Sequence, residues 1–166
     1  DLLVRPSNTM QCAIILRVCY LCNIFLTISA GQTNLTGSAT PKGGVVLSTS
    51  LLTSPDIKID ITNKEVLSPV GIGLEFLRSK VLKLSNRKLY YPVDPTSRHD
   101  AYVGGTLACN ASGFVPGVKG STRYWVNTID FLLPNGCLVH IKRNQYISKN
   151  GNFLLKYDNQ IIEIPV

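Results

Sequence analysis

Apolar and polar positions at the start of the chain follow a strand, helix, strand pattern. The apolar run Leu2–Val4 indicates a short first strand. Ser7 or Asn8 then caps an amphipathic helix that runs to about Tyr20, and the apolar run Phe25–Ile28 predicts a short buried strand. A helix between two such strands predicts a parallel βαβ unit.

The stretch Met10–Ala30 also resembles a signal peptide or a short membrane span. Arg17 lies in its middle, and a cation at the centre of a membrane helix costs on the order of 2.5–3.5 kcal/mol. Asn23 interrupts the stretch again, and no basic n-region precedes it beyond Arg5. The helix and strand of a soluble domain are therefore the favoured interpretation.

The middle of the chain predicts a strand, a hairpin and a helix. Val45–Leu47 is a short apolar run. Ile57–Ile61 alternates apolar and polar residues, and Glu65–Leu67 follows across a short polar turn, which favours a hairpin. Apolar residues at 74, 77, 81 and 84 have helical spacing, so Leu74–Leu84 is predicted to be a helix with a basic outer face.

Strands dominate the last third of the chain. Val126–Leu133 and Cys137–Lys142 flank an Asn-Gly pair, which is a strong hairpin signal. A second Asn-Gly pair predicts that Gln145–Ser148 is joined to Phe153–Tyr157 by a turn.

The order of these elements predicts an α+β fold in one domain. A small βαβ subdomain is expected over residues 1–50, and a larger, mostly antiparallel sheet flanked by helices over residues 51–166. A length of 166 residues with 45% hydrophobic residues is enough for a core, and 16% charged residues argue against intrinsic disorder.

Charge and cysteine content narrow the function without deciding it. The net charge is +7, from 17 Lys and Arg against 10 Asp and Glu, which favours nucleic acid, a membrane or a phosphorylated small molecule as partner. Five cysteines, an odd number, indicate a reducing compartment. Cys19 and Cys22 form a CxxC pair with no second pair, and His99 and His140 are far away in sequence, so buried thiols are favoured over a metal or redox site.

One loop has the composition that a diphosphate site requires. Ser29–Ser38 follows a parallel strand, and its hydroxyls and N–H groups would converge on phosphate oxygens. Gly31 and Gly37 relieve the steric limit on φ there.

A second segment has similar properties. Gly104–Gly113 lies within the loop-like stretch Tyr91–Gly120, and its paired glycines let the backbone approach a ligand closely. The run Thr106–Ala111 would start a helix whose N-terminal amides favour an anion. Neither segment is specific by itself, because ordinary turns have the same composition.

Six motifs follow one another along the chain: Gly31–Gly37, Pro41–Val46, Tyr91–Ser97, Val103–Gly113, Lys119–Arg123 and Leu133–Gly136. In this order they resemble the FAD-binding domain of the FAD-linked oxidase family, which includes vanillyl-alcohol oxidase and p-cresol methylhydroxylase. The likeness is closest to its D-lactate and glycolate dehydrogenase branch and covers nearly the whole chain.

The resemblance implies an FAD-binding fold of the p-cresol methylhydroxylase type, with FAD extended between the two subdomains. It implies that one loop wraps the pyrophosphate, that a second segment lines the cofactor path, and that a third contacts the diphosphate and the flavin. The residues of the loop are Ala30, Gly31, Gln32, Thr33, Asn34, Leu35, Thr36 and Gly37. Those of the other two segments are Pro92, Asp94, Pro95 and Ser97, and Gly104, Gly105, Asn110 and Gly113.

Two departures from the family pattern bear on the cofactor. Gln32 stands where many relatives have a further glycine, so the anion-binding loop is altered or the side chain lies over the cofactor. Thr33 stands where covalent members have a histidine, and no histidine lies in this loop, so we expect noncovalent FAD.

The resemblance also implies a longer parent enzyme. Family members continue past the equivalent of Val166 into the rest of the FAD pocket and a substrate domain with the catalytic histidines, so the chain is expected to be a fragment that holds no catalytic residue and no metal site. The parent would transfer hydride from a 2-hydroxy acid such as D-lactate or glycolate to FAD. We expect a cytoplasmic location, with a peripheral contact at the inner membrane or an electron-acceptor partner left open.

The rival class is a nonenzymatic basic module that binds RNA or another anionic partner. It needs exposed aromatic residues among basic ones, and Tyr90-Tyr91 after Arg87-Lys88 is the one hint. No nucleic acid is expected under the flavoprotein interpretation. A remnant of the flavoenzyme that folds poorly is a third interpretation.

Overall fold

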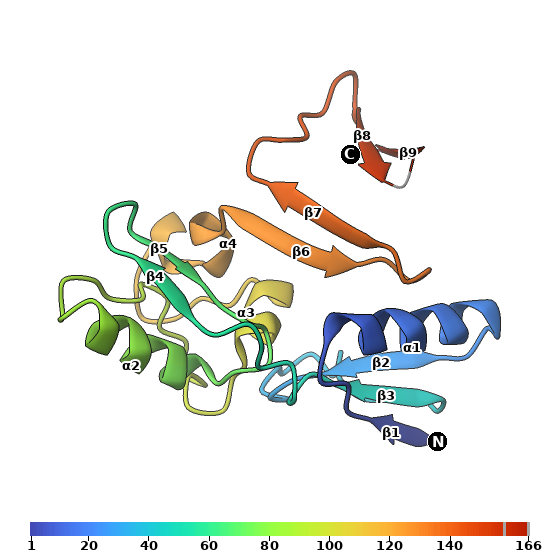
Figure 1. Ribbon diagram of the computed structural model, residues 1–166, viewed down its shortest axis with the longest axis horizontal. Helices are drawn as coiled ribbons and strands as arrows, with labels where there is room; N and C mark the ends of the chain where they lie inside the picture. Colours follow the sequence, from blue (N-terminus) through green and yellow to red (C-terminus); the bar gives the residue numbers. More distant parts are fainter. Residues whose placement is uncertain (158, 166) are drawn as a thin grey trace.

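The first three strands form a parallel layer with one helix. In the computed structural model, which describes residues 1–157 and 159–165, these strands are β1 (Leu2–Val4), β2 (Leu26–Ser29) and β3 (Val45–Ser48). Both β1 and β2 pair with β3 in parallel, so the order is β1-β3-β2. Helix α1 (Thr9–Leu21) connects β1 to β2 and runs alongside the sheet (Figure 1). The predicted βαβ unit is confirmed. The strand predicted to be buried over Phe25–Ile28 is not, because Phe25 and Ile28 are exposed.

Helix α1 begins where the sequence predicts. The Asn8 side chain caps the helix by accepting a hydrogen bond from the Gln11 N–H at 2.9 Å, and Gln11 Oε1 accepts one from the Ser7 N–H at 2.8 Å. Among the residues at 1–157 and 159–165, no helix combines the length and hydrophobicity needed to cross a membrane.

The predicted amphipathic character of α1 is only partly present. Its buried residues are Cys12 and Cys19. Met10, Ile14 and Val18 lie four residues apart along one side of the helix, and all three are exposed. The apolar face of α1 is therefore wider than the surface that the sheet covers.

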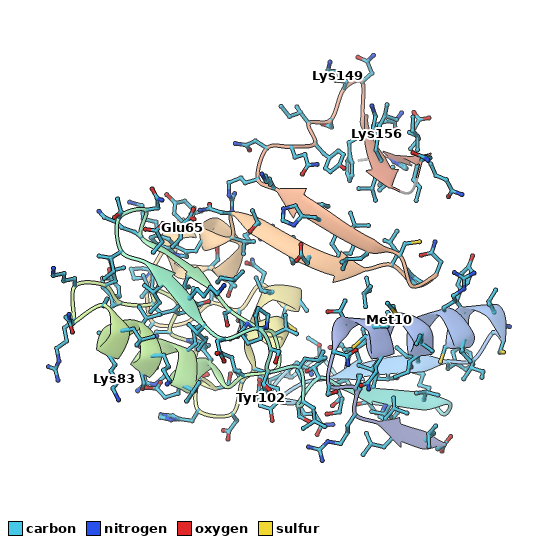
Figure 2. The ribbon with its side chains drawn as sticks, in the orientation of Figure 1. Met10, Glu65, Lys83, Tyr102, Lys149 and Lys156 are labelled. Carbon is cyan, nitrogen blue, oxygen red and sulfur yellow. The ribbon has the colours of Figure 1, made fainter. Side chains whose placement is uncertain are left out.

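A hairpin and a helix surround the main core. Strands β4 (Lys58–Asp60) and β5 (Glu65–Leu67) pair antiparallel, and helix α2 spans Leu74–Leu84, as predicted. The core residues come from α2 and from the chain on either side of it: Ile72, Leu74, Leu77, Val81, Ala101 and Val103. Tyr102, labelled in Figure 2, lies between the parallel layer and α2.

The stretch predicted to be loop-like holds short helices. Helix α3 spans Val103–Ala108, the 3-10 turn η1 spans Val118–Gly120, and helix α4 spans Thr122–Trp125. The helix predicted over Thr106–Ala111 starts earlier, at Val103, and ends at Ala108. It does not reach Ala111, because the chain turns out of the helix at Asn110, whose φ is 46°.

The remaining strands form hairpins. Strands β6 (Thr128–Leu132) and β7 (Leu138–Lys142) pair antiparallel around the predicted Asn-Gly turn. The glycine of that turn, Gly136, packs on α1, since a Cβ there would lie 2.7 Å from the carbonyl oxygen of Ala13.

The strand predicted at Gln145–Ser148 is absent from the described chain. Strand β8 (Asn152–Tyr157) pairs instead with β9 (Gln160–Pro165), along its whole length. The Asn150-Gly151 turn produces only an isolated bridge between Lys149 and Asn152. The segment Gln160–Pro165 therefore forms a longer run of residue pairs with β8 than the segment before the Asn150-Gly151 turn does.

The α+β class is confirmed, with a parallel βαβ layer followed by antiparallel strands and helices. The antiparallel strands lie in three two-stranded sheets, β4-β5, β6-β7 and β8-β9. Figure 1 shows the parallel layer on one side of the molecule and α2 with β4-β5 on the other.

Candidate cofactor-binding site

The two glycine-bearing segments predicted from the sequence lie against each other. A Cβ at Gly31 would lie 2.1 Å from the carbonyl oxygen of Asp100, just before α3. A Cβ at Gly105, in the first turns of α3, would lie 3.4 Å from Cβ of Ala30. The loop after β2 and the segment around α3 are distant in sequence and adjacent in space.

The backbone N–H groups of the loop Ala30–Gly37 are largely without hydrogen-bond partners in the described chain. Within the part of the chain that the structure describes, the N–H groups from Gly31 to Gly37 have no hydrogen-bond acceptor. The loop is tied internally by side chains instead: Asn34 Oδ1 accepts from the Ser38 N–H at 3.2 Å and from Thr36 Oγ1 at 3.3 Å. Consecutive free N–H groups form a concave site that binds anions such as phosphate.

Gln32 adopts a conformation in this loop that usually belongs to glycine. Its φ is 54°, and its side-chain Nε2 donates to Ser29 Oγ at 3.0 Å. Ser29 is the buried last residue of β2, and its carbonyl oxygen accepts from the Thr49 N–H at 2.9 Å. The Gln32 side chain is therefore turned back onto the end of β2.

The Pro92–Ser97 segment meets the far end of the second glycine segment. A Cβ at Gly113 would lie 1.8 Å from the carbonyl oxygen of Asp94, and the Phe114 N–H donates to that same oxygen at 3.1 Å. Pro95 is buried. The Ser97 carbonyl oxygen accepts from the N–H groups of Asp100 at 3.0 Å and Ala101 at 2.9 Å, which leads the chain into α3.

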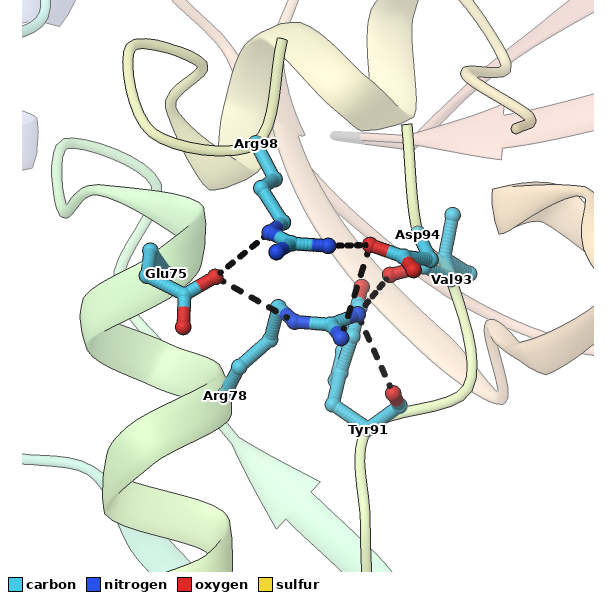
Figure 3. Close-up of polar contacts among 6 residues, drawn as sticks. All are labelled: Glu75, Arg78, Tyr91, Val93, Asp94 and Arg98. Carbon is cyan, nitrogen blue, oxygen red and sulfur yellow. Dashed lines mark hydrogen bonds and ion pairs between the residues drawn. The ribbon is translucent and has the colours of Figure 1, made fainter. Parts of the chain in front are cut away.

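The Asp94 carboxylate is held by two arginines (Figure 3). Asp94 Oδ1 lies 2.8 Å from Arg98 Nη1 and 3.4 Å from Arg78 Nη2. Glu75 bridges the same arginines, with Oε2 3.5 Å from Arg78 Nε and 3.2 Å from Arg98 Nε. The hydrogen bond from Arg98, helped by the charge of Arg78, lowers the pKa of Asp94 despite its partial desolvation.

This cluster fixes the extended segment on α2. Arg78 Nη1 also donates to the carbonyl oxygens of Val93 at 2.6 Å and Tyr91 at 3.5 Å. The Asp94 carboxylate is thus engaged with the two arginines within the protein. Sequence reasoning missed Glu75, Arg78 and Arg98, although the i, i+3 and i, i+4 spacings of the pairs were available as a signal.

The amides of the second segment are mostly used within the protein. The Val103 and Gly104 N–H groups donate to the carbonyl oxygens of Ile72 at 3.0 Å and Val70 at 2.9 Å. Asn110 Oδ1 accepts from the Arg123 N–H at 2.9 Å, which places α4. Among the residues described, the Gly105 N–H has no acceptor, so it is the free donor of the first turns of α3.

Other residues weighed from the sequence lie away from this site. Cys12 and Cys19 are buried as expected, but Cys22 and Cys109 are exposed. No group of three or more metal-ligating side chains occurs in residues 1–157 and 159–165. His140 is an exposed strand residue that contacts Asp130 on the neighbouring strand. Trp125 is exposed on α4 and donates from Nε1 to the Lys119 carbonyl oxygen at 2.7 Å.

Comparison with known families identifies the class of this domain. The family described as "FAD binding domain" matches residues 1–142. The chain belongs to this family, and its cofactor is FAD. The free loop amides fit that cofactor, because its pyrophosphate carries negative charge on oxygens that accept hydrogen bonds.

Individual relatives are named as dehydrogenases or oxidases. The chain is 28% identical to a D-lactate dehydrogenase of Archaeoglobus fulgidus over 92% of its length and 33% of the relative's. It is 30% identical to a D-lactate dehydrogenase of Anaerostipes hadrus, covering 93% of the chain and 32% of the relative, and 30% identical to glycolate oxidase subunit GlcD of Bacillus subtilis, covering 84% and 29%. The chain therefore spans about a third of the length of these relatives.

Solved structures show the same fold. An alkyldihydroxyacetonephosphate synthase superposes with a TM-score of 0.74 at 18% identity, covering 89% of the chain and 27% of the synthase. The 6-hydroxy-D-nicotine oxidase of Arthrobacter nicotinovorans superposes with a TM-score of 0.68 at 19% identity, covering 86% and 30%. The predicted fold family is confirmed.

Proposed function

We propose that the loop Ala30–Gly37 binds the pyrophosphate of FAD through its free backbone N–H groups. The observation that carries the proposal is the run of N–H groups without an acceptor from Gly31 to Gly37, which lies next to the free N–H of Gly105. Because these N–H groups have no acceptor within the described part of the protein, they are available to the oxygens of an anionic ligand. The net charge of +7 has the matching sign.

The other two segments complete the proposed cofactor path. Pro92, Asp94, Pro95 and Ser97 would line it with backbone and ring atoms, because the arginines hold the Asp94 side chain. Gly104, Gly105, Asn110 and Gly113 would border the diphosphate and the flavin side. The contact between Gly31 and Asp100 supports this arrangement, since it brings the first loop to the start of α3.

The protein to which this domain belongs would oxidise a 2-hydroxy acid. D-lactate dehydrogenase, glycolate oxidase and D-2-hydroxyglutarate dehydrogenase are the names of its relatives, and each names a 2-hydroxy acid. FAD accepts the hydride in such a reaction. The substrate would bind outside these 166 residues, so we expect no turnover of D-lactate by this chain alone. An electron acceptor is a further proposed partner.

Binding of FAD is tested by titration of the purified chain. We expect flavin fluorescence to change on binding and the melting temperature to rise with FAD concentration, by mass action. Gly31→Ala should lower FAD affinity at least about tenfold, because its Cβ would overlap the Asp100 carbonyl oxygen. Gly73→Ala is the matched control, since a Cβ there meets nothing within 4 Å.

One outcome would contradict FAD binding, and another would contradict its noncovalent attachment. One is no response of the wild-type chain to FAD together with a clear response to RNA, which would favour the basic module and its exposed Arg87, Lys88 and Tyr90. The other concerns the mode of attachment: the loop holds no histidine, so acid precipitation should release the flavin. Flavin that stays with the precipitate would show a covalent bond.

A further inference from the structure

We propose that Gln32 is a positioning residue of the FAD site, whose side chain holds the loop in the shape that presents its free amides. The inference rests on the proposed function and goes beyond it. It assigns a role to the one loop residue that departs from the glycine expected at its position.

The backbone of Gln32 has a conformation that costs free energy. Its φ of 54° is in the left-handed region, where a residue with a Cβ is less stable than glycine. The preceding residue is closely packed, because a Cβ at Gly31 would lie 2.1 Å from the carbonyl oxygen of Asp100. A side-chain interaction at residue 32 would therefore stabilise this conformation of the loop.

The side chain of Gln32 supplies that interaction. Nε2 donates to Ser29 Oγ at 3.0 Å, so the third residue of the loop Ala30–Gly37 is bonded back to the residue that precedes the loop. Ser29 is a firm anchor because it is 5% exposed and its carbonyl oxygen accepts from both the N–H of Thr49, at 2.9 Å, and Thr49 Oγ1, at 3.3 Å. The loop is thus tied to the ends of two parallel strands.

Comparison with similar residues shows that this bond is particular to the loop. Apart from asparagines, the described non-glycine residues with positive φ are Gln32, Lys64 and Arg87. Within the described chain, the side chains of Lys64 and Arg87 make no hydrogen bond, and both residues lie in exposed turns. The hydrogen bond at Gln32 is therefore no general consequence of a left-handed residue.

A double-mutant cycle of Gln32→Ala and Ser29→Ala tests the proposal. Each single variant should weaken FAD binding about fivefold, the value of one net hydrogen bond, and the double variant should be no weaker than either. Gln32→Gly should also weaken binding, because glycine accepts the conformation but lacks the anchor. Lys64→Ala, matched in φ and remote from the loop, should bind FAD as the wild type does.

The second measurement needs no cofactor. NMR order parameters of the amides from Gly31 to Gly37 should fall in Gln32→Ala and Ser29→Ala without FAD, and stay unchanged in Lys64→Ala. Additive losses in the cycle, tighter binding by Gln32→Gly, or weaker binding by Gln32→Ala with unchanged loop order would each overturn the proposal. If the wild-type chain itself fails to bind FAD, the proposed function fails, and the order parameters alone decide whether Gln32 orders the loop.

Discussion

The loop Ala30–Gly37 and the segment Gly104–Gly113 have similar composition but use it differently. In the loop, the N–H groups from Gly31 onward are free, and Gly37 has a positive φ of 73°. In the second segment most N–H groups are bonded inside the protein, and Gly113 serves to let the chain pass against Asp94. The loop keeps its N–H groups free of acceptors from the described chain, and the second segment provides the surface on which the loop rests.

The largest expected effect comes from filling the tightest contact of the second segment. In Gly113→Ala the new Cβ would overlap the Asp94 carbonyl oxygen, and backbone on both sides must move. We expect a loss of about 3 kcal/mol in the free energy of unfolding, measured by urea denaturation without FAD. Gly73→Ala, in open space, should differ from the wild type by much less. Equal stability of the two variants would show that the second segment has no close-packing role.

A substitution in the loop should act through conformation. Gly37→Ala leaves ordinary space around the new Cβ, whose nearest neighbour is Thr40 Oγ1 at 3.7 Å, but forces a left-handed alanine. We expect about 1 kcal/mol of destabilisation and weaker FAD binding, measured by thermal melts with and without FAD. A stability loss as large as that of Gly113→Ala would remove the distinction between the two segments.

The charge cluster under the second segment predicts a pH dependence. The pKa of Asp94 is lowered in the folded protein, so its contribution to stability is complete above the unfolded pKa, near pH 4, and is lost as pH falls through the lower folded pKa. Asp94→Asn should lower the free energy of unfolding by about 1 kcal/mol at pH 7, a value limited by solvent exposure of the arginines. The free energy of unfolding of this variant should also fall less steeply below about pH 4, in the acid limb of the stability curve. An acid limb unchanged in Asp94→Asn would assign that pH dependence to other carboxylates.

The smallest effect on stability is expected at Gly105. This glycine lies inside α3, and a Cβ would make only an ordinary contact with Ala30. Gly105→Ala should raise the free energy of unfolding by up to about 1 kcal/mol through helix propensity. It should also weaken FAD binding about tenfold, because the added methyl group would obstruct the close approach of the cofactor to the backbone of Gly105 that we propose. A gain in stability with unchanged affinity would place Gly105 outside the site.

Much of this fold could be predicted from local patterns. The cap at Asn8, the helical spacing of Leu74–Leu84 and the Asn-Gly turn before Cys137 depend on neighbours within a few residues, and all three are present. The strand at Gln145–Ser148 was wrong because its turn signal competed with a better partner downstream. Local composition does not show whether a strand pairs with the segment before it or with the segment after it.

The candidate site also has features that could be predicted from the sequence and features that could not. The resemblance to an FAD-binding family located the glycine segments, and that family is confirmed. The hydrogen bond of the Gln32 side chain could not be predicted, because it depends on the irregular local conformation of the loop. The bridging of Glu75 between Arg78 and Arg98 could not be predicted either, because it depends on a distance set by the tertiary fold. The individual cofactor contacts stay predictions.

The turn at Gly136 has a consequence for synthesis of the chain. It packs on the carbonyl oxygen of Ala13 and against Cβ of Arg17, so the surface of α1 is closed by residues made much later. Since chains emerge from the ribosome N-terminus first, the βαβ layer would form while part of α1 still faces solvent. Met10, Ile14 and Val18 are exposed even in the complete fold, and a nascent chain stalled before the β6-β7 hairpin would expose the uncovered side of α1 in addition, which would favour capture by a chaperone at that stage.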